Sequence, residues 1–274
     1  MKRIWKILIV VAVVVVFGLA AALLAGSWQK LKARDQLNRG VQAYRNAQYP
    51  EAVELFKRSI QLDPEFPTAK LYLATAYMMQ YIPGAESPEN LQMAQAAHDT
   101  FLEVLKQNPN DTVAIASVAS LYFNQKKFDE AQEWNRKLTQ VDPKNKEAFY
   151  TLGVIAWTKA FQVNAEARAK LGMRPEDPGP LKDKKVREEI KATQWAQIEQ
   201  GIQDLNKALE LDREYDDSMA YLNLLYRQRA DLQDTPEAYK RDTETADAWI
   251  QKTLETKKAK AARAPGAVGI TPEK

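Results

Sequence analysis

The sequence predicts an all-α protein in which one pattern of residues repeats along most of the chain. About 34 residues separate Gly40 from Ala74, and the same spacing separates Ala119 from Gly153. Asp-Pro pairs at 63–64 and 142–143 stand at the ends of two of the repeating units. Because the residue before a proline avoids the helical conformation, each pair is expected to end a helix. A single helix pair cannot bury its apolar face, so the units must stack.

The composition excludes several classes of enzyme. The chain has 274 residues, one His and no Cys. It therefore has no disulfide, no thiolate metal site and no Cys nucleophile, and no two His side chains can share a metal. No phosphate-binding loop or G-x-S-x-G motif occurs. His98 is expected to pack at a helix edge, and acidic pairs such as Asp129-Glu130 to be solvated. The sequence predicts a protein that is not an enzyme and that needs no cofactor or metal.

Residues 7–26 form an uncharged apolar run, ILIVVAVVVVFGLAAALLAG, between Trp5 and Trp28. As a helix this run is about 30 Å long, the thickness of the hydrocarbon core of a bilayer. Aromatic residues at both ends are typical of membrane interfaces. A cleaved signal peptide is the alternative, but 20 apolar residues exceed the usual 7–15 of a cleavable core. Residues 1–28 are therefore predicted to be a cytoplasmic tip and a transmembrane anchor.

The net charge of +3 belongs to the flank of this run. Lys2, Arg3 and Lys6 account for the whole excess, and the rest of the chain is neutral. We therefore expect no nucleic-acid partner. Positive charge also follows the run, so the orientation rests on the short N-terminal tail and the long C-terminal domain. The expected arrangement is a cytoplasmic N-terminus with the repeats outside the cytoplasm, in the periplasm of a bacterium.

The repeating units resemble the tetratricopeptide repeat (TPR) over most of residues 33–255. The third unit matches best, with Ala119, Tyr122, Ala131 and Pro143 at the expected positions. In other units the matching positions are Gly40, Tyr44, Ala52, Phe56, Pro64, Ala74, Tyr77, Ala97, Phe101, Pro109, Gly153, Gly201, Leu205, Ala208, Leu222, Tyr226, Ala246 and Ile250. The resemblance implies a solenoid of helical hairpins that winds as a right-handed superhelix. Its small residues would let paired helices approach closely.

Five repeats are expected near residues 33–66, 67–111, 112–145, 146–215 and 216–255, within a solenoid of residues 29–261. Two insertions interrupt them. Residues 79–90 are expected to form a loop, with Ser87 as the N-cap of the helix that follows. Residues 162–195, which turn at Pro175 and Pro180, are expected to extend a hairpin into a long helical arm beyond the solenoid. A disordered charged insert is the alternative. The basic end, residues 252–263, is expected to fray, and residues 262–274 to be a disordered tail.

TPR proteins usually bind partners on a concave face lined by the first helix of each repeat. The resemblance places the following residues there: Leu37, Val41, Tyr44, Arg45, Leu71, Thr75, Met78, Met79, Ser120, Phe123, Asn124, Tyr150, Val154 and Trp157. This face is aromatic and rich in methionine. The cationic clamp with which some TPR domains hold a terminal carboxylate is missing, because Val41, Tyr72 and Ser117 stand in its place.

The expected function is that of a membrane-anchored scaffold that binds protein partners. An apolar peptide or an amphipathic helix suits the face, because methionine adapts to varied shapes. The chain's own arm or tail is an alternative occupant. Two other functions stay open: an anchored receptor that faces the cytosol, and an oligomeric scaffold that self-associates through the arm.

Overall fold

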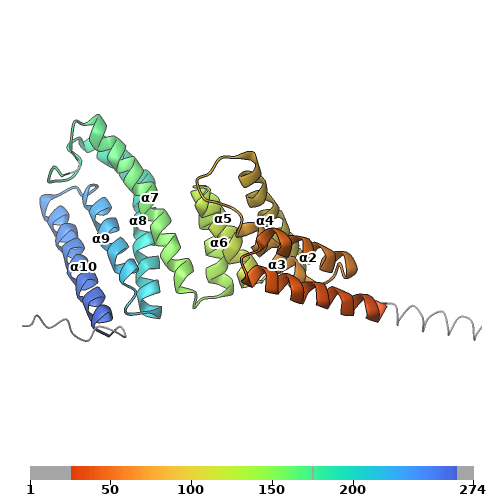
Figure 1. Cartoon of the computed structure of the whole chain (residues 1–274). Coiled ribbons are helices and arrows are strands. Elements are labelled where there is room, and N and C mark those ends of the chain that lie inside the picture. The colour runs from red at the N-terminus through yellow and green to blue at the C-terminus, as the bar shows by residue number, and fades with distance from the viewer. Residues whose placement is uncertain (1–25, 175, 264–274) are drawn as a thin grey trace, which may run out of the picture. The chain divides into compact units, whose positions relative to one another are not determined.

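The computed structural model describes residues 26–174 and 176–263, and every regular element in them is a helix. Within each of the two compact units of the chain, neighbouring helices lie antiparallel (Figure 1). The chain divides into two compact units, Met1–Lys127 and Phe128–Lys274. Each unit is described by itself below.

The first unit begins with a helix that covers residues 26–45 of the described chain. It continues with α2 (Tyr49–Leu62), α3 (Pro67–Met78), α4 (Pro88–Gln107) and α5 (Thr112–Asn124). Each of these helices packs against the next along the chain, and α3 also contacts α5. Leu37, Phe56 and Leu73 lie together in the core. The buried Ser59 hydroxyl donates to the Ala33 carbonyl oxygen at 2.8 Å and ties the first helix to α2.

The second unit contains α6 (Phe128–Val141), α7 (Lys146–Lys170), α8 (Lys184–Leu211), α9 (Asp216–Ala230) and α10 (Pro236–Arg263). The helix α7 packs along α8 and also contacts α6 and α9, while α9 packs along α10. The Arg136 guanidinium donates to the Asp204 carboxylate at 2.7 Å, which joins α6 to α8. The predicted all-helical fold is confirmed for the part of the chain that the structure describes.

Polar side chains cap the first turns of several helices, and Ser87 is the one that the sequence predicted. The Ser87 hydroxyl accepts from the backbone N–H of Asn90 at 3.2 Å, and Pro88 is the first residue of α4. Thr235 accepts from the N–H of Ala238 at 3.1 Å and begins α10 in the same way. Such caps satisfy backbone donors that a helix cannot satisfy itself. The loop before α4 is held by Asn90, which donates to the carbonyls of Ile82 and Ala85 at 2.8 and 2.7 Å.

Glycines mark the closest approaches between helices. A Cβ atom on Gly40 would meet the Phe56 ring at 2.5 Å, and one on Gly201 would meet the Ala156 side chain at the same distance. A Cβ on Gly153 would overlap the Leu205 side chain. These contacts explain why the pattern has small residues here: any side chain would push the paired helices apart.

The predicted arm is helical, but its end is not free. The helices α7 and α8 have 25 and 28 residues, and residues 171–183 join them. Leu181 is fully buried, and its N–H donates to the Asp231 carbonyl at the end of α9 at 3.0 Å. The tip of the arm is therefore held on the end of α9, a contact that the sequence analysis did not predict. Met173 and Leu181 belong to the same buried cluster as Leu232, which follows α9, so the tip of the arm packs on an apolar surface.

The basic end of α10 does not fray as predicted. The helix continues to Arg263. Lys260 and Lys257 pair with Asp216, and Arg263 pairs with Glu214 at 2.8 Å. These ion pairs hold the end of α10 against the start of α9. Residues 262 and 263 of the predicted tail are thus helical, and residues 264–274 lie outside the described residues.

The predicted membrane span, residues 7–26, lies outside the described residues except for Gly26. Among the helices of residues 26–174 and 176–263, none is long and apolar enough to cross a bilayer.

Candidate functional site

Two residues predicted to line the concave face belong to the core instead. Leu37 is 8% exposed and Val154 is 7% exposed. Leu37 packs with Phe56 and Leu73 between the first helices. The physical reason is helical geometry: a residue on the boundary of the inner face turns inward when the neighbouring helix is close. These two residues are therefore corrected from surface to core.

The other predicted residues of the first unit keep some exposure. Tyr44 packs edge to face on Tyr49, with ring centroids 5.4 Å apart, and burial raises its pKa. The Thr75 hydroxyl donates to the Leu71 carbonyl at 2.8 Å. Arg45 and Met79 are exposed, and half-buried positions are held by Val41, Leu71, Met78, Ser120, Phe123 and Asn124.

The remaining two predicted residues, Tyr150 and Trp157, lie in the second unit. They stand two turns apart on α7 and both contact Tyr221 of α9, with ring centroids 5.5 and 5.4 Å away. Trp157 also stacks on Phe161, at 5.3 Å, and Tyr150 contacts Tyr215, at 5.1 Å. We call these five residues the aromatic stripe. It runs along the contact between α7 and α9.

The hydroxyls of Tyr150 and Tyr215 stay uncharged at neutral pH. Burial, with smaller effects of Tyr221 and Asp217, raises the pKa of Tyr150 above its usual value of 10.0. Burial and a hydrogen bond to Glu147 do the same for Tyr215. The Trp157 indole N–H is buried and has no partner among the described residues. The stripe is therefore an apolar surface that carries neutral hydrogen-bonding groups.

A cavity of about 460 Å³ lies at the Phe161 end of the stripe. Phe161, Asn164, Ala165 and Ala169 of α7 form one wall of it. The opposite side comes from the end of α9 and the start of α10, with residues Gln228, Asp231, Tyr239 and Thr243. The loop after α7 closes it through Met173, Asp177 and Pro178. We call this space the α7–α9 cavity.

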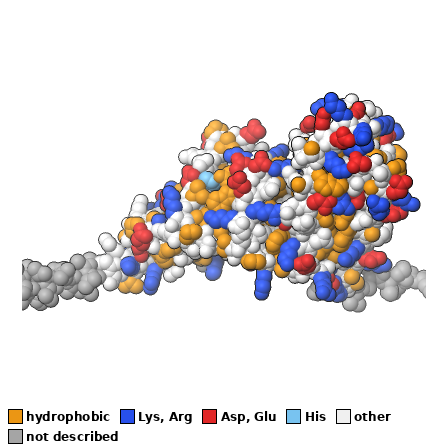
Figure 2. Space-filling view, turned by 180° about the vertical axis from the view of Figure 1, so that it is seen from behind, with side chains coloured by type: hydrophobic (Ala, Val, Ile, Leu, Met, Phe, Trp, Pro, Cys, Tyr) orange, Lys and Arg blue, Asp and Glu red, His pale blue; other side chains and the backbone are white. Residues whose placement is uncertain are grey.

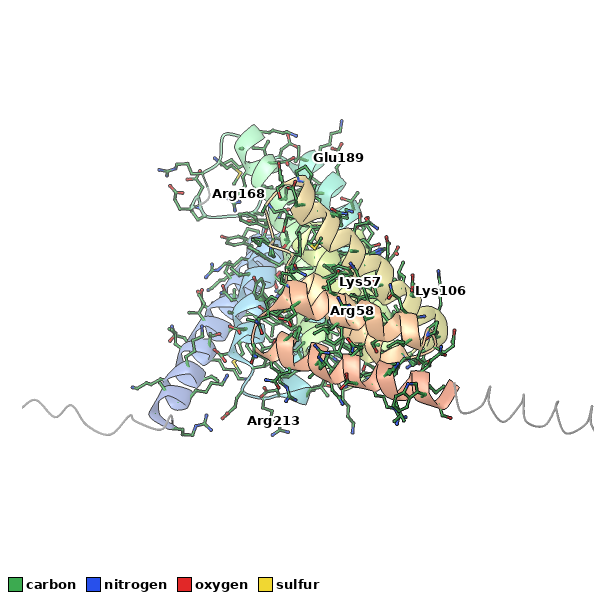
Figure 3. All side chains as sticks on the ribbon, turned by 45° about the vertical axis from the view of Figure 1, so that its right-hand side comes forward. Lys57, Arg58, Lys106, Arg168, Glu189 and Arg213 are labelled. Carbon is green, nitrogen blue, oxygen red and sulfur yellow. The ribbon has the colours of Figure 1, made fainter. Side chains whose placement is uncertain are left out.

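Arg168 holds this loop in place. Its guanidinium pairs with Asp231 and donates to the carbonyls of Arg174, Asp177 and Gly179 at 3.2–3.3 Å. Both side chains of the pair are nearly buried, at 12% and 11% exposure. Burial raises the pKa of Asp231, and Arg168 beside it opposes that shift. In Figure 3 Arg168 lies beside the loop that joins α7 to α8.

Sequence reasoning missed the α9 half of the stripe. Tyr221 belongs to the fifth repeat, from which no groove residue was predicted, and Tyr215 is the last residue of the fourth. The sequence did contain a signal for the α7 half of the stripe. Tyr150 and Trp157 are seven residues apart and Phe161 follows four residues later, a spacing that places all three on one face of a helix. The cavity had no comparable signal, because residues from three distant segments form it.

The residues considered for chemistry are structural. The two ring nitrogens of His98 contact the Tyr122 hydroxyl at 2.9 Å and the Asp99 carboxylate at 3.1 Å. Asp129 pairs with Lys159. No group of three metal-binding side chains is found in residues 26–174 and 176–263. On the face shown in Figure 2, acidic and basic side chains are interspersed, with hydrophobic patches between them.

Comparison with known proteins agrees with this architecture. Residues 114–145 match the family model of the tetratricopeptide repeat. A crystal structure of MamA protein superposes with a TM-score of 0.59 at 12% identity, covering 87% of this chain and 98% of that chain. The chain has a TPR fold. No curated protein matches it in sequence.

Two further TPR-fold structures give the same result. MamA 41-end from Desulfovibrio magneticus RS-1 has a TM-score of 0.55 at 19% identity and covers 83% of this chain and 96% of that chain. YrrB, described as a TPR protein with an unusual peptide-binding site, has a TM-score of 0.51 at 11% identity and covers 82% of this chain and 90% of that chain. At these identities the likeness concerns the fold.

Proposed function

We propose that this protein is a scaffold that binds an apolar segment of a partner protein on the aromatic stripe. The observation that carries the proposal is the stripe itself. Tyr150, Trp157 and Tyr221 are half-buried, and Phe161 is 49% exposed. Aromatic side chains with partial exposure and a polar tip are enriched where proteins bind one another. The TPR fold supports the proposal, since a structure with this fold is described as having a peptide-binding site.

The proposal also includes a membrane anchor at residues 7–26. The helix that follows this run begins with exposed apolar side chains: Trp28 is 60% exposed and Leu31 is 57% exposed. The Lys32 ammonium lies 5.5 Å from the centre of the Trp28 ring. Aromatic and basic side chains together are typical of the lipid headgroup region. The expected location is a bacterial envelope, with the N-terminus in the cytoplasm and the TPR units in the periplasm.

An anchored receptor that faces the cytosol is the alternative with the opposite orientation. The chain contains no Cys, so single cysteines can report the orientation directly. Lys2→Cys and Ala196→Cys place one thiol before the run and one on the exposed face of α8. In intact cells a membrane-impermeant maleimide should label the second thiol and leave the first unlabelled. The reverse pattern would establish the cytosolic orientation, and labelling of neither would contradict an envelope location.

A self-associating scaffold is the remaining alternative. The tip of the arm is already packed against α9 within one chain, through Leu181 and Asp231. That contact reduces the surface that the arm offers to a second copy. Light scattering of the full chain in detergent, before and after deletion of residues 170–195, should give the same number of chains per particle. A loss of mass equal to one or more whole chains would favour the oligomeric scaffold.

The binding proposal is tested by comparing matched variants of the full chain. Trp157→Ala and Phe161→Ala remove stripe residues, and Trp134→Ala is the control, because Trp134 lies on α6 outside the stripe. Proteins crosslinked to the wild-type chain in membranes are identified first. The stripe variants should lose these proteins at least tenfold, while Trp134→Ala keeps them and helicity stays unchanged. Equal capture by all variants would refute binding on the stripe.

A further inference from the structure

We infer that the α7–α9 cavity is an anchor pocket that takes one uncharged aromatic side chain of the bound segment, tryptophan or tyrosine. The inference rests on the proposed function, because it describes how the segment on the stripe is recognised. It assigns a site and a preference that the repeat pattern does not contain, since the loop of residues 171–183 and the lengthened helices build the cavity.

The cavity is continuous with the stripe. Phe161 stacks on Trp157, with ring centroids 5.3 Å apart, and also lines the cavity. A segment that lies on Tyr150 and Trp157 therefore reaches the opening of the cavity without a gap. The volume of about 460 Å³ falls in the range of pockets that bury a ligand. A buried side chain in such a pocket is the usual source of binding energy at a protein interface.

Most charged side chains around the cavity have an ion-pair partner. Arg168 pairs with Asp231, and Arg227 pairs with Asp247 at 2.6 Å. Glu176 and Asp177 both contact Arg174, at 3.6 and 3.0 Å. A charged side chain that entered the cavity would lose its water, and the nearly buried Arg168–Asp231 pair would offer it no free counter-charge. This arrangement selects against lysine, arginine, aspartate and glutamate in the anchor position.

Neutral hydrogen-bonding groups remain unused. Asn164 is 1% exposed, and its amide nitrogen donates to the backbone carbonyl and the side-chain oxygen of Gln228, both at 3.1 Å. Its own oxygen, Oδ1, has no partner among the described residues. The Tyr239 hydroxyl, which lines the same cavity, likewise forms no hydrogen bond with them. A buried acceptor without a partner is costly, and an indole N–H or a phenol O–H removes that cost. Phenylalanine lacks such a donor, so it should bind more weakly.

The first experiment measures the preference with defined probes. N-acetyl-tryptophanamide, N-acetyl-phenylalaninamide and N-acetyl-lysinamide are titrated into the full chain in detergent, and binding is followed by saturation-transfer NMR. The tryptophan probe should bind at least fivefold more tightly than the phenylalanine probe, and the lysine probe should not bind. Equal binding of the lysine probe, or no binding of the tryptophan probe, would overturn the inference.

The second experiment blocks the cavity. Ala165 and Ala169 are exposed, stand one turn apart on α7 and line the cavity, so Ala165→Phe with Ala169→Phe fills it from a surface that needs no repacking. Ala196→Phe on the exposed face of α8 is the control. The double variant should weaken the tryptophan probe more than tenfold and the control should not. Unchanged binding in the filled variant would place the probe elsewhere and refute the pocket.

The third experiment tests the role of Asn164 and separates the two proposals. Asn164→Leu should remove the preference for tryptophan over phenylalanine and keep the binding of both; an unchanged preference would contradict the assignment of Oδ1. With the captured partner, loss of binding in Trp157→Ala but not in the filled variant would refute the pocket and leave the proposed function standing. Retention of the partner by both variants would refute the proposed function itself.

Discussion

The indole ring of Trp157 on α7 stands edge-on to the ring of Tyr221 on α9, with centroids 5.4 Å apart and planes at 76°. These residues are 64 positions apart in the sequence and belong to the first helices of successive pairs. The contact joins the fourth helix pair to the fifth at the surface where we propose that a partner binds. It therefore serves both the stability of the second unit and the shape of the stripe.

The Trp157–Tyr221 contact should be measurable as a coupling free energy. Edge-to-face aromatic pairs contribute about 0.5–1.5 kcal/mol beyond the area that they bury. In a double-mutant cycle with Trp157→Ala and Tyr221→Ala, the free energies of unfolding should depart from additivity by that amount. Urea titration followed by circular dichroism gives the four values. Additivity within about 0.3 kcal/mol would mean that the rings only lie near each other.

Gly153 should tolerate no side chain. A Cβ atom there would overlap Leu205 of α8, and overpacking a core costs about 1–3 kcal/mol. Gly153→Ala should lower the free energy of unfolding by that amount in a thermal or urea melt. Leu205→Ala is destabilising alone, but it should recover part of the loss when combined with Gly153→Ala, because it makes room for the new methyl group. A double variant as unstable as the sum of the two would argue against this contact.

Breaking the Arg168–Asp231 pair should release the loop after α7. Removing one partner of a buried ion pair costs about 3–5 kcal/mol, because the other charge stays buried and uncompensated. We expect a smaller loss for Asp231→Asn, about 2 kcal/mol, since the amide oxygen still accepts from the guanidinium. Hydrogen exchange should accelerate at residues 173–181 and at Leu181 above all, whose N–H donates to the Asp231 carbonyl.

The Arg168–Asp231 prediction has its control in a double replacement. Arg168→Leu with Asp231→Leu removes both charges and should be more stable than either single variant, because no charge is then left buried alone. If Asp231→Asn left both the unfolding free energy and the exchange at residues 173–181 unchanged, Arg168 would not be what holds this loop.

The end of α10 should loosen in acid. Lys260, which hydrogen-bonds to Asp216, lowers the pKa of that carboxyl below its usual 3.8. A lowered pKa in the folded state means that the stabilisation is complete above about pH 4 and is lost as the pH falls further. The effect is small, about 0.5–1 kcal/mol, since Lys260 is partly exposed.

The Asp216 prediction is measured by hydrogen exchange at residues 255–263. Protection there should fall between about pH 4 and pH 3 in the wild-type chain and should already be low at neutral pH in Asp216→Asn. Asp217→Asn is the matched control, because Asp217 is exposed and forms no ion pair among the described residues. Equal protection in both variants would show that packing alone holds the end of α10.

Much of the helical architecture could be predicted from the sequence. Ser87 before Pro88 and the small residues at Gly40, Gly153 and Gly201 act over a few residues or within one helix pair, so their effect is local. The prediction of which residues line the concave face was less accurate. It placed Tyr150 and Trp157 in the stripe but also included Leu37 and Val154, which are buried. A repeat register gives the direction of a side chain only to within part of a turn, and the neighbouring helix decides whether that direction is core or surface.

The sequence by itself determined that the chain is a set of stacked helix pairs with aromatic residues on the first helices. The periodic apolar positions and the helix-ending prolines that predict this act on residues close to them in the sequence. It also located the net charge beside the apolar run at residues 7–26. Only the tertiary structure decided that the arm is docked, that Tyr221 completes the stripe and that Asn164 lines a cavity. Those features depend on contacts between residues 50 or more positions apart, and packing in three dimensions settles which contacts form.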